Sequence, residues 1–377
     1  MTQLELIATA SFGLEAVVAR ELKQLGYEDQ TTEDGRVTFV ADEVAVCRSN
    51  LWLRSADRVL LKLGEFVARD FGTLFDQTNA IPWADWLSED AEFPVRGKSV
   101  RSQLTSVPDC QSIVKKAIVE KLKQQYKRDW FKETGPAFAV EVSLLKDRAT
   151  LTLDTTGPGL HKRGYRTLSG AAPLKETLAA GLVQLSYWNR ERPLIDPFCG
   201  TGTIPIEAAL IGRNIAPGLH REFAAEQWPR FPKQLWTEAR SEAQDSVTDE
   251  LAFPILATDI DSEAISMARY HAKRAGVEND IHFQQKPFSK LTTKKTFGCV
   301  ICNPPYGERM GEEQESEAIY REMRNIFSPL ETWSIYVLTS NSQFEKLFGR
   351  KADRRRKLYN GRIECTYYQF FGPPPPR

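Results

Sequence analysis

A short polar motif, Asn303-Pro304-Pro305-Tyr306, directly follows the apolar run 298–302. The prolines cannot donate backbone hydrogen bonds and favour an extended chain, so the carbonyl groups here remain available as acceptors. Asn303 adds a carboxamide, and Tyr306 adds a flat ring with a polar tip. This set of groups could hold a planar amine. A proline-rich turn that ends a strand accounts for the four residues equally well.

A second motif, DPFCGTGT at residues 196–203, connects a predicted strand to a predicted helix. A glycine-rich turn of this kind lets a ligand approach backbone N–H groups closely. Ile206 or Glu207 stands where a dinucleotide fingerprint has its third glycine, and the motif lacks the Gly-Lys-Ser/Thr of a P-loop. An adenosine-type ligand without phosphates therefore fits better than a nicotinamide dinucleotide or a nucleoside triphosphate.

An acidic residue at the end of the following strand would bind the ribose hydroxyls of such a ligand. The predicted strand PILATDI provides Asp259, with Asp261 as the alternative. Asp259 lies much further along the chain from Gly202 than the roughly 20 residues usual in dinucleotide folds. We expect a helical insertion over residues 213–250 to account for the extra length.

Both motifs lie in a repeated strand–turn–helix pattern that starts near residue 174. Such a pattern predicts an α/β domain with a mostly parallel sheet covered by helices on both faces. The predicted strands are PLIDPF, PILATDI, IHFQQ, FGCVIC and WSIYVLTS, followed by an antiparallel pair, RRKLYN and RIECTYYQF. Two smaller α+β modules precede this domain. A stretch rich in Gly, Pro and small polar residues, 157–173, is predicted to be the hinge between them and the α/β domain.

The composition, 41% hydrophobic and 27% charged over 377 residues, is that of a soluble globular protein of several domains. The chain start does not resemble a secretory signal, and the scattered cysteines fit reduced thiols, so we expect a cytoplasmic protein that does not enter a membrane. Cys299 and Cys302 form a C-x-x-C pair. Residues three apart in a strand face opposite sides, so we expect no metal there.

The formal net charge is zero, but positive charge is concentrated in two stretches. Residues 93–166 hold 15 Lys and Arg against 7 Asp and Glu, and a shorter run, RKADRRRK, covers residues 350–357. Segregated positive charge in a neutral protein indicates a phosphate-binding face, although a solvated face explains each run equally well. The residues predicted to contact the phosphates of a nucleic acid are Lys98, Arg101, Lys115, Lys116, Arg163 and Arg166.

DPFCGTGT, ATDID and NPPY together resemble the class I, S-adenosylmethionine-dependent amino-group methyltransferases. Four longer stretches are similar to the bacterial THUMP-domain rRNA guanine-N2 methyltransferases: LHKRGYR at 160–166, APLKETLAA at 172–180, IAPGLHREFAAE at 215–226 and NPPYGERM at 303–310. The similarity covers essentially the whole chain, and also extends to the half of the enterobacterial bifunctional large-subunit rRNA enzyme that methylates guanine N2. Chains of this kind are often labelled adenine N6 DNA methylases, because both groups share NPPY.

The resemblance implies the domain organisation. We expect a ferredoxin-like module at 1–54, a THUMP RNA-binding domain at 55–156, a linker at 157–173 and a Rossmann-like class I methyltransferase domain with a seven-stranded sheet at 174–377. The implied cofactor is S-adenosylmethionine, and the implied partner is 23S rRNA or a large-subunit precursor.

The resemblance also implies site residues. The backbone from Cys199 to Thr203 would hold the methionine part of the cofactor and Asp259 its ribose. The full expected cofactor set is Asp196, Phe198, Cys199, Gly200, Thr201, Gly202, Thr203, Asp259, Ile260 and Asn303. Lys286 and Pro287 stand where the family commonly has an aspartate that meets the adenine amino group. The adenine contacts must therefore come from backbone groups or neighbouring residues.

The expected reaction is methylation of the N2 amine of a guanine in 23S rRNA. The expected catalytic residues are Asn303, Pro304, Pro305 and Tyr306. The Asn303 oxygen and the Pro304 carbonyl would accept the two amine hydrogens, while Tyr306 stacks on the extruded base. No covalent enzyme intermediate is required. Two alternatives remain open, namely adenine N6 methylation of DNA or RNA and an RNA-binding assembly factor with a vestigial methyltransferase fold.

Overall fold

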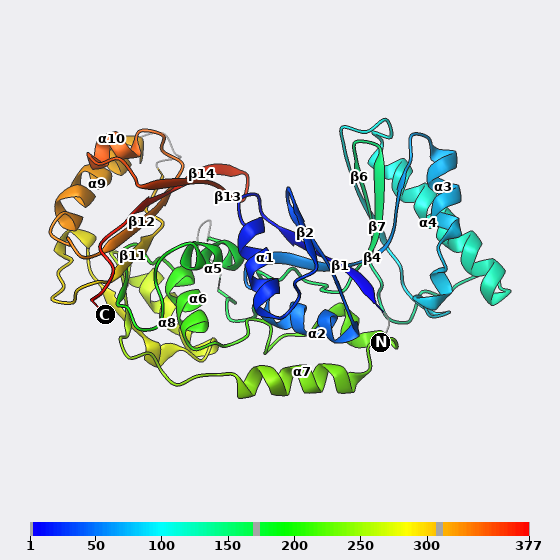
Figure 1. The fold of residues 1–377 in the computed structure, drawn as a ribbon, viewed down its shortest axis with the longest axis horizontal. Helices are drawn as coiled ribbons and strands as arrows, with labels where there is room; N and C mark the ends of the chain where they lie inside the picture. The colour runs from blue at the N-terminus through cyan, green and yellow to red at the C-terminus, as the bar shows by residue number, and fades with distance from the viewer. Residues whose placement is uncertain (1–2, 169–173, 307–311, 377) are drawn as a thin grey trace.

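The computed structural model describes residues 3–168, 174–306 and 312–376, which form two seven-stranded sheets (Figure 1). The first sheet and its helices comprise β1 (Leu4–Ala10), α1 (Glu15–Gln24), β2 (Gln30–Glu33), β3 (Arg36–Ala41), α2 (Glu43–Trp52), β4 (Ala56–Val67), α3 (Phe71–Ala80), β5 (Val95–Val100), α4 (Val107–Tyr126), β6 (Val140–Leu145) and β7 (Arg148–Asp154). The second comprises α5 (Glu176–Gln184), β8 (Leu194–Asp196), α6 (Thr203–Gly212), α7 (Lys233–Asp245), β9 (Ile255–Asp259), α8 (Ser262–Arg274), β10 (Ile281–Gln285), β11 (Cys299–Cys302), α9 (Glu312–Phe327), β12 (Ser334–Thr339), α10 (Phe344–Phe348), β13 (Arg354–Asn360) and β14 (Ile363–Phe370).

The first sheet has the strand order β2-β3-β1-β4-β7-β6-β5 and continues through both N-terminal modules. The long strand β4 makes this possible, since its first half pairs with β1 and its second half with β7. The two modules therefore share β4, and the sheet shows no break at the boundary predicted between residues 54 and 55. No helix among the described residues is long and apolar enough to cross a membrane.

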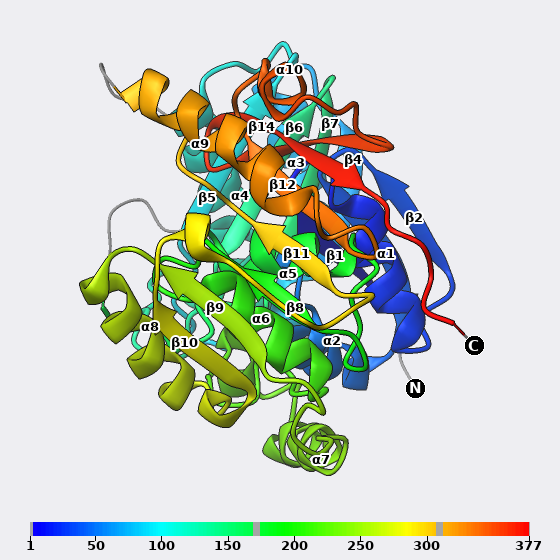
Figure 2. The ribbon, with the colours of Figure 1, turned by 90° about the vertical axis from the view of Figure 1, so that its left-hand side faces the viewer.

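The second sheet has the order β10-β9-β8-β11-β12-β14-β13. The strands from β10 to β12 are parallel, while β14 runs antiparallel to both of its neighbours (Figure 2). Helices α5, α6 and α8 pack on one face, and α9 and α10 pack on the other. Cys299 lies in the first of these cores and Cys302 in the second, which confirms that they face opposite sides.

The insertion predicted at residues 213–250 packs against the first sheet. Its side chains Phe223, Trp228, Phe231 and Trp236 are buried in the core of the N-terminal modules. Trp228 stacks on Phe138 with the ring centroids 4.6 Å apart, and its indole N–H donates to the Ala137 carbonyl at 3.0 Å. The insertion ends in α7, which packs against α2 and lies along one side of the molecule in Figure 1. The C-terminal part of the chain thus contributes to the N-terminal core.

The described part of the predicted hinge, residues 157–168, is irregular but packed. Leu160, Arg163 and Tyr165 are all buried. This segment is therefore held against the folded domains on either side of it. The rest of the predicted hinge, residues 169–173, lies outside the described residues.

Candidate active site

The turn between β8 and α6 has a backbone that only glycine adopts easily. Gly200 and Gly202 have φ of +50° and +88°, in the left-handed region. A Cβ atom added to Gly202 would lie 3.0 Å from the Cβ of Ala268 on α8, closer than nine in ten real Cβ contacts. The turn is closed by a hydrogen bond from the Gly202 N–H to the Cys199 carbonyl, 2.8 Å long. The shape of the turn and the close packing on α8 thus explain why glycine stands at these positions.

Two carboxylates stand at the ends of the neighbouring strands β8 and β9. Asp196 is buried, with Oδ1 accepting the Phe198 N–H at 3.1 Å and Oδ2 unpartnered among the described residues. Burial raises the pKa of Asp196 well above its ordinary value, and the Asp259 carboxylate raises it further. Asp259 accepts the Gly200 N–H at 2.8 Å and the Asp261 N–H at 3.0 Å. Asp259 therefore fastens the glycine turn to the end of β9.

Asp261, the alternative ribose ligand, has a structural role. Its Oδ1 accepts the Glu263 N–H at 2.8 Å and caps the first turn of α8. Ile260, between the two aspartates, is 71% exposed, which is unusual for isoleucine. This exposed apolar side chain beside the glycine turn offers a surface for a purine ring.

The segment after β10 supplies an aromatic residue that sequence reasoning missed. Phe288 lies against Phe198 of the glycine turn, with ring centroids 4.8 Å apart. The Lys286 N–H donates to the Asp259 carbonyl at 2.8 Å, and Pro287 begins the short 3-10 helix Phe288–Lys290. Proline at this position thus turns the chain so that Phe288 reaches the site. The aromatic residue directly after the proline was the available signal.

His271, which sequence reasoning also missed, contacts the glycine turn from helix α8. The ring on α8 is fully buried, and Nδ1 lies 3.1 Å from the Thr201 carbonyl. Burial lowers the pKa of His271, so the neutral ring with Nδ1–H donating to Thr201 is favoured near neutral pH. Nε2 is buried without a partner among the described residues.

The NPPY motif begins where β11 ends, beside the glycine turn, because β11 pairs in parallel with β8. The Tyr306 hydroxyl donates to Asn303 Oδ1, and burial raises the pKa of Tyr306 above its ordinary value. The Pro305 carbonyl accepts from the Tyr320 hydroxyl at 2.8 Å, and Tyr320 also contacts Thr339 Oγ1 at 2.9 Å. Helix α9 and strand β12 thus fix the motif. Of NPPYGERM, residues 307–310 lie outside the described residues.

The residues predicted to bind RNA phosphates fall in two places. Lys98, Arg101, Lys115 and Lys116 lie on or beside β5 and α4, and the last two line a shallow groove between these elements. Lys98 forms an ion pair with Glu141 at 2.8 Å. Lys115 is held by Glu133 at 2.8 Å and by the Phe93 carbonyl at 3.0 Å. Arg101 and Lys116 are exposed.

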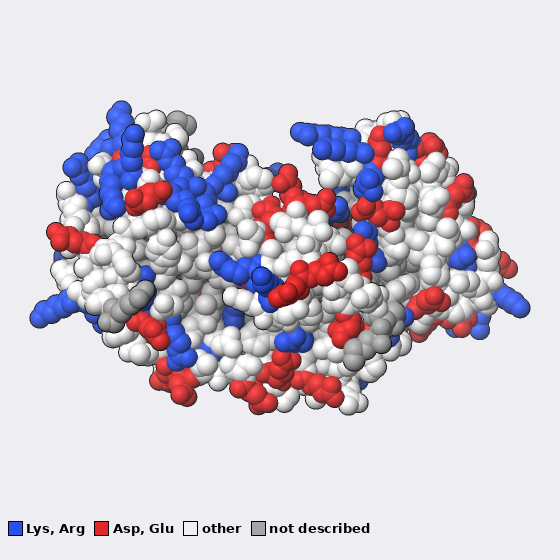
Figure 3. All heavy atoms as spheres, viewed as in Figure 1, with Lys and Arg blue, Asp and Glu red and all other residues white. Residues whose placement is uncertain are grey.

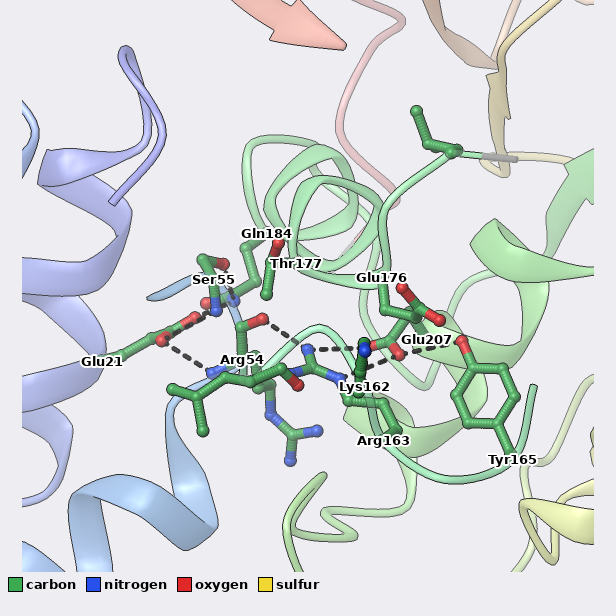
Figure 4. Close-up of polar contacts among 12 residues, drawn as sticks. Glu21, Arg54, Ser55, Lys162, Arg163, Tyr165, Glu176, Thr177, Gln184 and Glu207 are labelled. Atoms are coloured by element: carbon green, nitrogen blue, oxygen red, sulfur yellow. Dashed lines mark hydrogen bonds and ion pairs between the residues drawn. The ribbon is translucent and has the colours of Figure 1, made fainter. Parts of the chain in front are cut away.

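Arg163 and Arg166 instead belong to the interior of the domain junction. Arg163 is buried, donates to Arg54 and Leu160 carbonyls, and pairs with Glu207 at 3.2 Å (Figure 4). The prediction that Arg163 contacts RNA is therefore wrong, because its guanidinium is enclosed and neutralised. Arg166 donates to Thr203 Oγ1 at 2.6 Å and pairs with Glu176 at 3.4 Å, which ties the linker to the start of α6.

Comparison with known proteins identifies the family. Residues 163–369 match the RMKL-like methyltransferase domain, residues 5–60 the RlmL ferredoxin-like domain and residues 68–154 the THUMP domain. The chain belongs to the RMKL-like methyltransferase family. The strand order of the second sheet and the glycine turn beside Asp259 are those of a class I methyltransferase domain, as predicted.

Relatives match over nearly the whole length. YpsC of Bacillus subtilis, described as a candidate RNA methyltransferase, is 52% identical over 98% of this chain and 97% of its own. A solved Listeria monocytogenes protein, described as a predicted N6-adenine-specific DNA methylase, is 50% identical, with a TM-score of 0.94 over 99% of this chain and 97% of its own. SMU.472, described as a candidate methyltransferase and solved in complex with SAH, is 45% identical, with a TM-score of 0.94 over 100% of both chains. The cofactor of this methyltransferase is S-adenosylmethionine.

Proposed function

We propose that this protein methylates the exocyclic N2 amine of a guanine in 23S rRNA. The observation that carries the proposal is Asn303, whose carboxamide stands at the end of β11 beside the glycine turn, with its oxygen held by Tyr306. The THUMP domain and the relative described as an RNA methyltransferase support RNA as the substrate. The similarity to rRNA guanine-N2 enzymes supports the base and the RNA.

The residues of the glycine turn suit S-adenosylmethionine, which when bound supplies an electrophilic methyl group. Gly200 and Gly202 leave room for close approach to the backbone, and Asp259 lies where the ribose hydroxyls would be. Asp259 already accepts one backbone N–H on each oxygen, and each oxygen retains capacity for a ribose hydroxyl. Ile260 and Phe288 give the adenine apolar surfaces, in place of the aspartate that the family commonly has.

Asn303 and the Pro304 carbonyl would orient the amine. A guanine amine is conjugated with its ring and is a poor nucleophile until acceptors hold both of its hydrogens. The Tyr306 hydroxyl fixes the Asn303 carboxamide before a base arrives, and the oxygen keeps a second lone pair for an amine N–H. Preorganised groups of this kind need no rearrangement during the reaction.

The test is transfer of a labelled methyl group to 23S rRNA from a strain that lacks the gene, followed by digestion to nucleosides. We expect the label in N2-methylguanosine. Asn303→Ala should lower turnover by on the order of a hundredfold or more while the cofactor affinity stays nearly unchanged. Tyr306→Phe should lower turnover by about tenfold, since it loses the hydrogen bond that fixes Asn303.

Other outcomes would count against the proposal. Label in N6-methyladenosine would favour adenine methylation, the activity predicted for the Listeria monocytogenes relative. Undiminished activity of Asn303→Ala would remove Asn303 from the mechanism for either base. Tight RNA binding with no transfer to any RNA would favour the assembly-factor alternative.

A further inference from the structure

The edge strand β13 carries two rows of cations, and only one of the rows is paired with carboxylates. On one face, Arg355 pairs with Glu345, and Lys357 pairs with Glu364 at 2.6 Å. On the other face, Arg354 and Arg356 have no carboxylate within ion-pair distance among the described residues. Because alternate residues of a strand face opposite sides, the unneutralised pair forms a row of its own. Figure 3 shows that Lys and Arg gather over α10, β13 and β14.

A third cation reaches this row from the ferredoxin-like module. The turn before α1 packs directly on β13, with Phe12 edge-on to Tyr359 at 5.9 Å and Gly13 against the Lys357 carbonyl. Arg20 projects from α1, is exposed, and donates to the Gln184 carbonyl at 2.8 Å.

Contacts at the end of α5 bring Arg20 to the end of this row, because Arg20 donates to the Gln184 carbonyl and Gln369, the cross-strand partner of Arg354, donates to the Leu185 carbonyl at 3.3 Å. Arg356 lies in the same row. It is half-buried, and its Nε is enclosed without an acceptor among the described residues. Burial lowers the pKa of Arg356, and the positive charges of Arg354 and Arg20 lower it further. Like charges at short range repel one another unless an anion lies between them. The cluster is therefore arranged as one half of an anion-binding site.

We propose that Arg20, Arg354 and Arg356 form a phosphate-binding seam for the RNA backbone, at the junction of α1 and β13. The proposal rests on the proposed function, because it assigns a docking surface to the same RNA. Guanidinium groups present several N–H donors in a planar arrangement that suits phosphate oxygens. The seam lies apart from the β5–α4 groove and combines residues of the ferredoxin-like and methyltransferase domains.

The direction of β13 relates the seam to the active site. This strand runs parallel to β12, so its last residue, Asn360, lies at the same edge of the sheet as NPPY. The pairing across β12 and β14 aligns Arg355 with Cys302, so Arg356 lies level with the start of NPPY, three strand spacings or roughly 14 Å across the sheet.

The experiment compares the two faces of β13 on the same protein. RNA binding is measured by fluorescence anisotropy at several salt concentrations, with deproteinised 23S rRNA fragments and a short oligouridylate as probes. Arg20→Gln/Arg354→Gln/Arg356→Gln should reduce the slope of log affinity against log salt by roughly 2, at about 0.7 for each lost phosphate contact. Arg20→Gln/Arg354→Gln, which changes exposed residues only, should reduce it by roughly 1.4.

The matched control is Arg355→Gln/Lys357→Gln, on the opposite face of the same strand. We expect its slope to change much less, since those cations already have carboxylate partners. If the control lost as much of the salt slope as the seam variants, a diffuse positive field would explain RNA binding better than the seam. An unchanged salt slope in both seam variants would contradict the proposal directly. If the wild-type protein methylates RNA and the seam variants bind RNA as well as it does, the seam is refuted and the proposed function is not. A wild-type protein that binds no RNA refutes the proposed function as well.

Discussion

At the scale of single residues, two neighbouring aspartates have different roles. Asp259 holds the glycine turn and faces the proposed ribose position, while Asp261 caps α8. The sequence ATDID offered both as ribose ligands. Local patterns could not distinguish them, because the difference lies in which backbone N–H each carboxylate accepts.

We predict that Asp259→Ala weakens S-adenosylmethionine binding by about 1–3 kcal/mol, the penalty for ribose hydroxyls left without an acceptor. Asp261→Ala is the matched control. It should lower the free energy of unfolding by about 1 kcal/mol through the lost cap and leave cofactor affinity largely intact. Isothermal titration calorimetry and urea unfolding measure the two effects. The assignment fails if Asp261→Ala weakens binding as much as Asp259→Ala.

The buried His271 gives the fold a dependence on pH. Its pKa is lower in the folded protein than the ordinary value of 6.5, so the unfolded chain takes up the proton first as the pH falls. The free energy of unfolding should therefore be highest above about pH 6.5 and should decline as the pH falls below it. His271→Gln, which can still donate to the Thr201 carbonyl, should flatten this dependence between about pH 7.5 and about pH 5.5. His282→Gln, at an exposed position, should leave the pH dependence unchanged. An identical pH dependence of unfolding for the wild type and both variants would contradict the role of His271.

At the scale of elements, the glycine turn depends on its contact with α8. Gly202→Ala should lower the free energy of unfolding by the left-handed strain of about 1–2 kcal/mol, and by a further contribution from the contact with Ala268. Gly276→Ala is the control, since it has φ of +70° but nothing within 4 Å of the added Cβ. Chemical unfolding should show the larger loss for Gly202→Ala, with weaker cofactor binding for this variant only. Equal losses would mean that backbone strain alone explains Gly202.

Much of the element order could be predicted from the sequence. The strands of the second sheet are apolar runs that end in polar turns, and all seven lie where the pattern placed them. Strand β2 carries no such signal, because its residues, QTTE, are polar and mostly exposed. Arg163 was misassigned since its partner, Glu207, is 44 residues away, and charge patterning reveals only the cation. Burial and long-range pairing decide such cases.

At the scale of the whole molecule, a buried ion pair joins the linker to the catalytic domain. Arg163 and Glu207 are both enclosed, and the Tyr165 hydroxyl donates to Glu207 at 3.1 Å. Glu207→Gln should lower the free energy of unfolding by roughly 3–5 kcal/mol, because it leaves a buried charge unpaired. Arg163→Met/Glu207→Leu should lose less than the sum of the two single variants. Additive losses in thermal or urea unfolding would show that the two side chains do not act as a pair.

The packing of the 213–250 insertion into the N-terminal core has a consequence for target choice. The insertion belongs to the catalytic domain in sequence, yet its aromatic side chains are buried beside those of the THUMP side of the molecule. The span from the β5–α4 groove to NPPY is therefore set by a shared core rather than by a loose tether. An RNA bound in this groove, as proposed, would be modified at the base that lies at one fixed distance from the bound feature, whatever the sequence between them.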